Sequence, residues 1–422
     1  MGPPVRELLR HRDFRLLLAG QTATGFGDWT LLLVFGIWGR SLTGSNAVAG
    51  LMVFAMAAPG LLGPLGGWVA DRVPRRGLLV AVDLVSVPAV LSLWCVHDRG
   101  QLWVLFAVAV WYGLSSLVVA SAMSGLVQSM LEPDLVGRAN GALTTVRQGL
   151  RLIGPLVGAG LFTAVGGAWV ATLDAATFVL SAVALLLVRG REQRVERDPA
   201  PFRREVAAGI THIARTAVLR HLAVCEIGVV AAIGVLEPVL YALIDHGLHR
   251  PASFLGVLAT AQGVGAIAGG LAATALVTRV GERALLVAGL ALLAAGVAAE
   301  AVPVLGVALV GFAVFGAGLP GLQVAAATLL QRSTPNVVMG RVAAAFEVIG
   351  SVPYTAAIGL GAVLVGRVDH RLLFWAVAVA LAGAVVYAAT VIGRTAAPRA
   401  QPAPHVPQPA PAPAPPGPLP VR

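Results

Sequence analysis

The stretch Gly67-Trp68-Val69-Ala70-Asp71-Arg72-Val73-Pro74-Arg75-Arg76 joins two long apolar runs, 47–70 and 77–96. Each run is long enough to cross a bilayer, because about 20 apolar residues in a helix span its hydrocarbon core. An acid and three arginines between two such runs belong at the membrane surface, since charge is costly inside the bilayer. The stretch therefore predicts two membrane helices joined by a charged surface loop.

The composition of the whole chain supports a membrane protein. Of its 422 residues, 57% are hydrophobic and 12% are charged, and the mean hydropathy is +0.84. A chain this apolar needs the bilayer as its solvent. The net charge of +10 indicates basic cytoplasmic loops, and no nucleic-acid partner is expected, because the arginines fall between apolar runs. No Walker loop, zinc-ligand spacing or nucleophile elbow occurs, so we expect no metal, no cofactor and no enzymatic activity.

Twelve apolar segments are long enough to be membrane helices. With the N-terminus inside, 23 of the 30 arginines fall on the cytoplasmic side and five in external loops. This positive-inside bias places both termini in the cytoplasm. We predict an all-α, multi-pass protein of a bacterial cytoplasmic membrane, with helices near 15–39, 47–70, 77–96, 101–129, 142–165, 168–189, 219–244, 253–277, 284–302, 303–331, 341–366 and 371–393.

The longest internal loop divides the chain into two predicted bundles of six helices, 1–189 and 219–394. Residues 190–218 contain an amphipathic stretch, which we interpret as an interfacial helix on the inner leaflet. Residues 395–422 are rich in Pro and Ala. Proline cannot sustain a helix, so this segment is expected to be a disordered tail; a solvated tail is favoured over a polyproline ligand for a partner.

The two halves repeat in sequence. Residues 128–138, which end in Val-Gly-Arg, align without a gap with residues 331–341, which end in Met-Gly-Arg, at an offset of 203. Residues 72–79 align with residues 279–286 at an offset of 207. Two alignments at nearly equal offsets indicate a parallel repeat of six helices, and such repeats place the substrate site between the halves.

The chain resembles the major facilitator superfamily over residues 14–393, most closely the drug-exporter branch with its macrolide-efflux and siderophore-export proteins. The similarity rests on the 67–76 loop, 14–17, 27–29, 81–84 and 137–140. It implies a cytoplasmic gate in which the acid of the loop docks against helix 11, and a partial antiporter motif in helix 5. The gate residues implied are Gly67, Asp71, Arg72, Arg75, Arg76, Arg138 and Arg341, and those of the helix-5 motif are Gly141, Gly154, Pro155 and Gly158.

The sequence departs from this family at several positions. Pro74 stands where the loop usually has glycine, and Leu150 and Ala159 replace glycines of the helix-5 motif. The arginine that many drug exporters carry in helix 4 is absent, since 101–129 contains no charge.

Acids within the predicted membrane helices are functional candidates, because charge there is expensive. We predict proton-coupling or cavity roles for Asp28, Glu226, Glu237 and Glu347. Glu226 and Glu237 fall within about 20° of one helix face and about 16 Å apart along it, which suits two stations for a proton. In the alternative, Glu237 lies at a wet outer mouth and Glu226 pairs with an arginine. For Asp28, a structural hydrogen bond is the rival role.

Arg151 is the clear interior base, in helix 5. Asp83 and Glu347 are both candidate partners for it. We predict a structural ion pair between Asp83 and Arg151, in preference to a clamp for an anionic substrate.

These features predict a secondary transporter that acts as a monomer by alternating access. The expected partners are a small amphipathic substrate, protons and the lipid bilayer. Export in exchange for protons is favoured from the resemblance. A lipid or lysophospholipid flippase, a proton-symport importer and a non-transporting membrane sensor or scaffold remain open.

Overall fold

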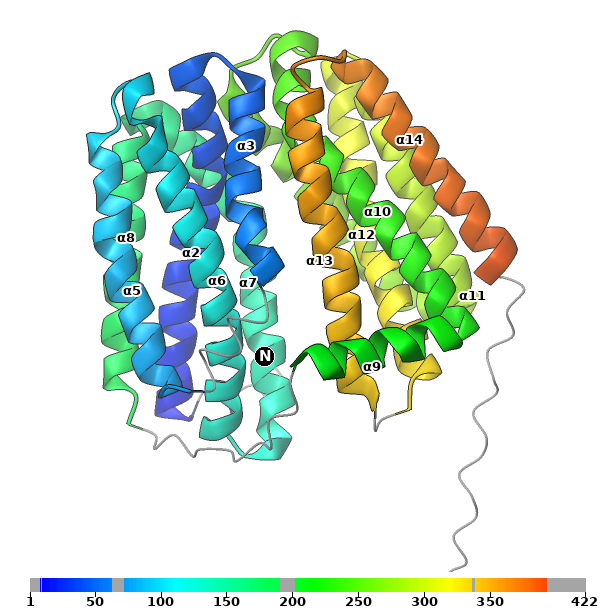
Figure 1. The fold of residues 1–422 in the computed structure, drawn as a ribbon, viewed down its shortest axis with the longest axis horizontal. Coiled ribbons are helices and arrows are strands. Elements are labelled where there is room, and N and C mark those ends of the chain that lie inside the picture. Colours follow the sequence, from blue (N-terminus) through cyan, green and yellow to red (C-terminus); the bar gives the residue numbers. More distant parts are fainter. Residues whose placement is uncertain (1–7, 9, 63–71, 190–201, 336–337, 393–422) are drawn as a thin grey trace, which may run out of the picture.

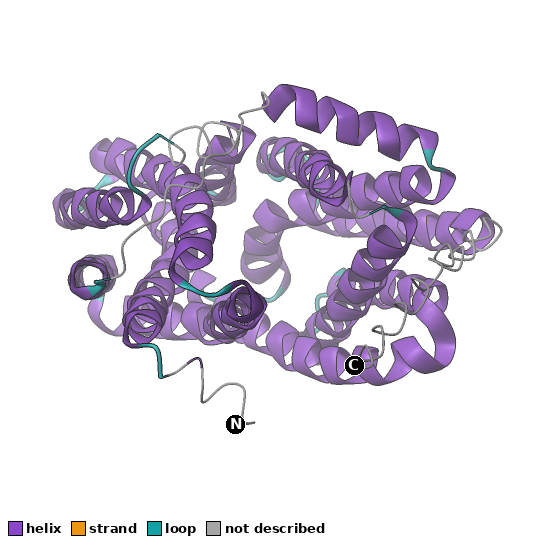
Figure 2. Cartoon of the chain, turned by 90° about the horizontal axis from the view of Figure 1, so that it is seen from below, coloured by secondary structure: helices purple, strands orange, loops and turns teal. Residues whose placement is uncertain are grey.

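The computed structural model describes residues 8, 10–62, 72–189, 202–335 and 338–392. Only helices and connecting loops occur in this part of the chain (Figure 2). The helices of the N-terminal half are α2 (Arg12–Thr43), α3 (Asn46–Ala57), α5 (Arg75–Leu91), α6 (Leu102–Met130), α7 (Pro133–Val165) and α8 (Gly167–Leu187). Those that follow are α9 (Phe202–Arg215), α10 (Ala217–Ala242), α11 (Leu255–Glu300), α12 (Leu305–Ser333), α13 (Met339–Leu364) and α14 (His370–Tyr387).

Short helical pieces extend or connect these elements. A 3₁₀ turn continues α3, and a π-helical turn continues each of α10 and α14; three further 3₁₀ turns follow α5 or lead into α6 and α11. The extending turns are Ala58–Leu62, Leu243–Gly247 and Ala388–Ile392, and the connecting ones are Ser92–Cys95, Arg99–Gln101 and Ala252–Phe254.

The long helix α11 contains two membrane spans. Its backbone breaks at Gly281, where φ is 82° and ψ is 162°. Only glycine adopts this region without strain, so the break is encoded locally. The two parts, Ala252–Ala273 and Arg279–Glu300, are each long and apolar enough to cross a bilayer. This agrees with the separate helices predicted near 253–277 and 284–302.

Ten helices of the described chain meet the length and hydropathy of a membrane span. Two more complete the twelve of the predicted fold. Helix α2 has 32 residues and so extends about 48 Å, although it also carries polar side chains such as Asp28. The apolar helix Asn46–Leu62 is shorter, and the rest of its predicted span lies outside the described residues.

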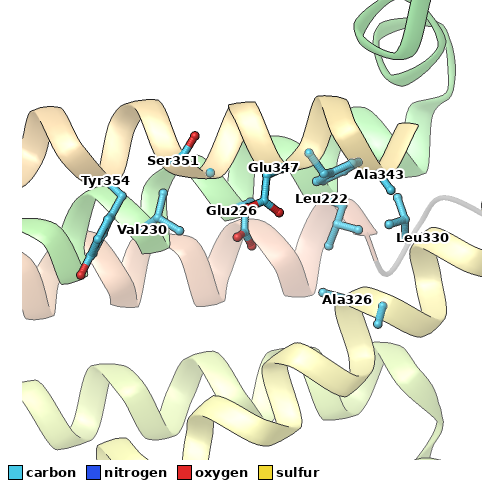
Figure 3. A pocket seen from close by; sticks show the side chains of 12 residues that line it. Leu222, Glu226, Val230, Ala326, Leu330, Ala343, Glu347, Ser351 and Tyr354 are labelled. Atoms are coloured by element: carbon cyan, nitrogen blue, oxygen red, sulfur yellow. The ribbon is translucent and has the colours of Figure 1, made fainter. Parts of the chain in front are cut away.

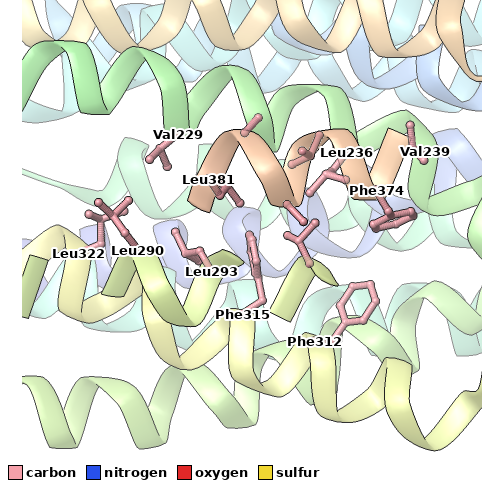
Figure 4. Close-up of a cluster of buried hydrophobic side chains, with 14 of the residues drawn as sticks. Val229, Leu236, Val239, Leu290, Leu293, Phe312, Phe315, Leu322, Phe374 and Leu381 are labelled. Carbon is pink, nitrogen blue, oxygen red and sulfur yellow. The ribbon is translucent and has the colours of Figure 1, made fainter. Parts of the chain in front are cut away.

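The helices form two bundles that meet at one end (Figure 1). Helices α2, α3, α5, α6, α7 and α8 make the N-terminal bundle, and α10 to α14 make the C-terminal bundle. Two apolar clusters lie within the N-terminal bundle, and the largest cluster fills the C-terminal bundle and continues into α2, α3 and α7. Figure 4 shows part of the larger core, where Leu290, Leu293 and Phe315 lie against α10 and α14. Contacts between the bundles are made by α3 with α10 and α13, and by α7 with α11.

Helix α9 lies across the base of the C-terminal bundle (Figure 1). The end of the molecule at which it lies is called the α9 end. Its apolar side packs on α13 in a small cluster formed with Ile213, Val342 and Ala345. The sequence predicted an amphipathic helix here, whereas the remainder of the predicted linker and the predicted tail lie outside the described residues.

Candidate functional site

A cavity of about 470 Å³ lies within the C-terminal bundle between α10, α12 and α13. Two candidate acids of the sequence, Glu226 of α10 and Glu347 of α13, line it together, and Figure 3 shows both carboxyl groups pointing into it. The remaining lining residues are mostly apolar: Leu222, Val230, Ala326, Ala327, Leu330, Ala343, Phe346, Gly350, Ser351 and Tyr354. We call this space the acidic cavity.

Close packing of α10 on α13 brings the two acids together. A Cβ atom at Gly234 would lie 2.6 Å from the Tyr354 carbonyl oxygen and 2.9 Å from the Ala357 Cβ. Glycine is therefore required at this crossing. Further along, a Cβ atom at Gly350 would lie 3.6 Å from Glu226 Oε1, so a larger residue there would contact this carboxyl group.

Tyr354 connects the acidic cavity to the third candidate acid of this bundle. Its ring lines the cavity, and its hydroxyl donates to Glu237 Oε1 at 3.3 Å. Glu237 is half-buried and has Tyr241 near its carboxyl group. Tyr354 is not among the predicted site residues, although tyrosine is rare in this chain, with four residues in all. A tyrosine in the middle of an apolar helix is a usable signal.

Arg151 of α7 faces this same region and not Asp83. Its guanidinium lies 5.7 Å from the centre of the Trp29 ring, a cation–π contact, and it acts electrostatically on Glu237 and Tyr354. The predicted ion pair between Asp83 and Arg151 is therefore wrong. The cause is the packing of α5, which turns Asp83 toward α8.

The acids of the N-terminal bundle form a second group, away from the acidic cavity. Asp28, Asp83 and Asp174 lie close enough to repel one another. Asp83 is 6% exposed and Asp174 fully buried. Asp174 accepts hydrogen bonds from the Tyr112 hydroxyl and from Thr177 Oγ1. Asp28 is half-buried and lies near Asp83 and Asp174 within its own bundle.

A polar network ties the two bundles together at the end opposite α9. Arg40 of α2 forms an ion pair with Asp245, which follows α10. Arg40 Nε also donates to Asn46 Oδ1 at 2.7 Å, and Asn46 Nδ2 donates to Asp245 Oδ2 at 3.3 Å. Gly44, with φ of 70°, makes the tight turn that sets Arg40 beside Asn46. The sequence analysis missed this network because its members sit at span ends, where polar residues are common.

Small residues let the bundles approach closely near this network. The Tyr241 hydroxyl of α10 lies directly against Gly36 of α2, where a Cβ atom would collide with it. A Cβ at Gly50 of α3 would lie 3.0 Å from Pro238 Cγ of α10. The two bundles are therefore closed against each other at this end.

The predicted helix-5 motif lies at two helix contacts. A Cβ at Gly154 would lie 3.0 Å from the Trp29 carbonyl carbon, and Gly158 lies directly against the Thr30 carbonyl oxygen, so α7 rests on the backbone of α2. The Pro155 carbonyl oxygen lies 3.2 Å from the position of a Cβ at Gly256 of α11, across the bundle interface. Gly141 lies in open space.

The predicted cytoplasmic gate is described only in part, since Gly67 and Asp71 lie outside the described residues. Arg75 donates to the Gly125 carbonyl of α6 at 3.1 Å, and Arg76 donates to the Leu186 carbonyl of α8 at 2.5 Å. These bonds cap the C-terminal parts of two helices, where a positive charge is favoured. Arg72, Arg138 and Arg341 are exposed at the same end.

A match over most of the chain identifies its protein family. Residues 17–236 and 222–419 match the sequence profile of the Major Facilitator Superfamily, and the chain belongs to this family of membrane transporters. It is 27% identical over 340 residues to the "Uncharacterized MFS-type transporter y4rN" of Sinorhizobium fredii (strain NBRC 101917 / NGR234), covering 78% of this chain and 82% of that protein. It is 28% identical to the "Uncharacterized MFS-type transporter YfiS" of Bacillus subtilis (strain 168) over 47% of this chain and 46% of that protein.

Solved structures show the same fold. An auto-inhibited peptide transporter of the POT family aligns with a TM-score of 0.71 and 13% identity, covering 91% of this chain and 97% of that one. A bacterial homologue of the iron transporter ferroportin, solved in an inward-facing state, aligns with a TM-score of 0.68 and 19% identity, covering 89% and 98%. At these identities the likeness establishes the all-α transporter fold with its two six-helix repeats.

Proposed function

We propose that this membrane transporter exports a small amphipathic cation in exchange for protons. The substrate would enter from the cytoplasm at the α9 end and leave on the opposite side. The arginine bias supports this orientation and cytoplasmic termini, and the bacterial relatives support a place in the bacterial cell membrane.

The acidic cavity is the observation that carries the proposal. Its wall is mainly apolar, and it holds two carboxyl groups, Glu226 and Glu347. In the described chain neither group forms an ion pair with an arginine or histidine side chain. Two neighbouring carboxylates in apolar surroundings are stabilised by a proton or by a cationic ligand. An amphipathic cation supplies both the charge and the apolar surface that this cavity fits.

Coupling follows if the substrate and protons compete for the same carboxyl groups. Tyr354 links the acidic cavity to Glu237, which lies 11 residues beyond Glu226 on α10, about 16 Å along the helix. A proton entering from the side opposite α9 would reach Glu237 first and the acidic cavity second. Asp28 and Arg151 would form the facing wall of the central site in the N-terminal bundle.

Alternating access requires the two ends to close in turn. The Arg40–Asn46–Asp245 network and the contacts of Gly36 and Gly50 close the end opposite α9. The loop containing Asp71 would close the α9 end by docking against α13, as the family resemblance implies. The monomer contains both bundles and would suffice for transport.

Efflux of a lipophilic cationic dye from energised cells tests this function. Cells that express the protein should accumulate less dye than empty cells, and an uncoupler should remove the difference. Glu226→Gln should reduce the efflux rate by about tenfold or more, because it removes a charge that binds the cation. Glu282→Gln is the matched control, since Glu282 pairs with Arg332 at 2.9 Å outside the cavity.

Three outcomes would contradict the proposal. Dye uptake in place of extrusion would indicate an importer. Movement of labelled lipid without movement of dye would indicate a flippase. Extrusion that persists equally in Glu226→Gln and in the wild type would remove the acidic cavity from the mechanism.

A further inference from the structure

A second, smaller pocket lies between α9 and the start of α13, outside the acidic cavity. It has a volume of about 180 Å³. Three of its lining side chains can donate hydrogen bonds from nitrogen: His212 and Arg215 of α9, and Arg341 of α13. The others are small or apolar, apart from Thr211. No carboxylate is among the lining residues, so the positive charge of the pocket is not offset within it.

The nitrogen-bearing side chains of this pocket have no side-chain partner in the described part of the chain. His212 Nε2 is buried without a hydrogen-bond partner. Within the part of the chain that the structure describes, neither Arg215 nor Arg341 makes an ion pair or a side-chain hydrogen bond. Thr211 donates to the Ala207 carbonyl in its own helix. A buried donor without a partner is costly, which points to a ligand that accepts hydrogen bonds here.

The pocket is held in place by packing, unlike a cluster of surface arginines. Gly209 lets α9 rest on the backbone of α13, because a Cβ there would collide with the Arg341 carbonyl oxygen and lie 2.8 Å from the Ala345 Cβ. Val342 and Ala345 are fully buried beneath α9. The three donors therefore belong to two helices whose spacing is fixed by a glycine contact.

We propose that this pocket binds a phosphate group, carried by an anionic phospholipid or by a soluble phosphate compound. Two guanidinium groups and an imidazole supply donors suited to phosphate oxygens. The positive end of the α13 dipole adds to them, since α13 begins at Met339. Ile210, next to the pocket on α9, is 44% exposed and offers apolar surface to an acyl chain.

Bound phosphate would fasten α9 to α13. Arg341 belongs to the start of α13, so occupancy of the pocket would fix this helix start relative to α9. This role is separate from substrate binding in the acidic cavity, and a binding measurement tests it whether or not the proposed export is correct.

Binding of a short-chain fluorescent phosphatidylglycerol to the purified full-length protein in neutral detergent is the test. Diacylglycerol with the same label serves as the probe without phosphate, and inorganic phosphate serves as the soluble competitor. Arg341→Gln should weaken phosphatidylglycerol binding about tenfold, the size of one charge-assisted hydrogen bond. Arg332→Gln is the control, because it removes an equal charge from α12, where Arg332 pairs with Glu282.

A second variant keeps every charge. Ala208 lines the pocket and is exposed, so Ala208→Phe should fill the pocket and block binding without removing a donor. Ala208→Phe therefore tests the site even if Arg341→Gln does not fold.

Each result has a defined meaning. Loss of phosphatidylglycerol binding in Arg341→Gln and Ala208→Phe, but not in Arg332→Gln, supports the site. Displacement of the lipid by millimolar inorganic phosphate also supports it and assigns a soluble ligand. Equal loss in Arg341→Gln and Arg332→Gln, or unchanged binding in Ala208→Phe, overturns it, as does equal binding of the diacylglycerol probe.

Discussion

The two bundles place their membrane acids in different surroundings. In the N-terminal bundle, Asp83 and Asp174 are buried among other helices, and Asp174 has Tyr112 and Thr177 as hydrogen-bond partners. In the C-terminal bundle, Glu226 and Glu347 line a cavity of about 470 Å³. All four are carboxylic acids within predicted membrane helices. The packing of the helices decides which of them are buried and which face a cavity.

This difference teaches that an intramembrane acid has two possible uses. A carboxylate held by neighbouring hydroxyl groups joins helices where lipid offers no hydrogen bonds. A carboxylate that faces a cavity is available to a proton or a ligand. Asp28 is half-buried and lies near the two buried acids of its own bundle.

Removing both cavity acids should have the largest effect. Glu226→Gln combined with Glu347→Gln should lower dye transport about a hundredfold, because each carboxylate contributes about tenfold through a charge-assisted contact. Transport is measured in proteoliposomes with an imposed pH gradient. Asp83→Asn is the comparison from the other bundle and should keep most of the activity. If Asp83→Asn abolished transport while the double variant stayed active, the acids of the N-terminal bundle, and not those of the acidic cavity, would carry transport.

For Asp174 we expect a loss of stability with little loss of transport. Asp174→Ala leaves the Tyr112 hydroxyl without its buried acceptor and should destabilise the fold by about 2 kcal/mol. Thermal unfolding in detergent should show a lower Tm than for the wild type, while Glu226→Gln should leave Tm unchanged. Transport per folded molecule should stay within about twofold of the wild type. An unchanged Tm would show that the buried acids of the N-terminal bundle do not hold its helices together.

Tyr354→Phe sharpens the account of the C-terminal bundle. It removes the hydroxyl that donates to Glu237 and keeps the ring that lines the acidic cavity. Dye binding should change little, whereas proton-driven transport should fall by about five- to tenfold, the size of one ordinary hydrogen bond. Equal losses of binding and transport would assign Tyr354 to the substrate alone. Tyr387→Phe, at a tyrosine that bonds His221 in the same bundle, is the control.

The smallest effect concerns the contact between the bundles. Arg40→Gln removes the ion pair with Asp245, which is partly exposed and therefore worth about 1 kcal/mol. The ratio of closed to open molecules at that end should fall about fivefold. Spin labels on the two bundles, at exposed outer positions, should show a longer distance more often. An unchanged distribution would mean that the Gly36 and Gly50 contacts alone hold this end closed.

The sequence predicted much of this fold. Helix length, hydropathy and the internal repeat gave the all-α transporter architecture, including the two separate spans within α11. It also singled out Glu226, Glu237 and Glu347, because a charge in an apolar span is conspicuous. The sequence could not show which of these acids share a cavity, because that depends on how the helices pack.

The sequence could not predict which side chains contact each other across neighbouring helices. The Asp83–Arg151 pair was wrong because the rotation of α5 and α7 about their axes decides which residues meet. The Arg40–Asp245 pair was not predicted because both residues lie at span ends. Tyr354 was not predicted, although its place in an apolar helix distinguishes it. Contacts of this kind depend on backbone approach at residues such as Gly234 and Gly36, where one Cβ atom would shift a helix.

Proton release on substrate binding tests the central claim most directly, that a cation and protons compete for the acidic cavity. Purified protein in weakly buffered detergent is mixed with the cationic dye, and a pH indicator reports the protons released per dye bound. We expect about one proton per dye for the wild type and for Asp83→Asn, and none for Glu226→Gln with Glu347→Gln. Dye binding without proton release in the wild type, or unchanged release in the double variant, would contradict it.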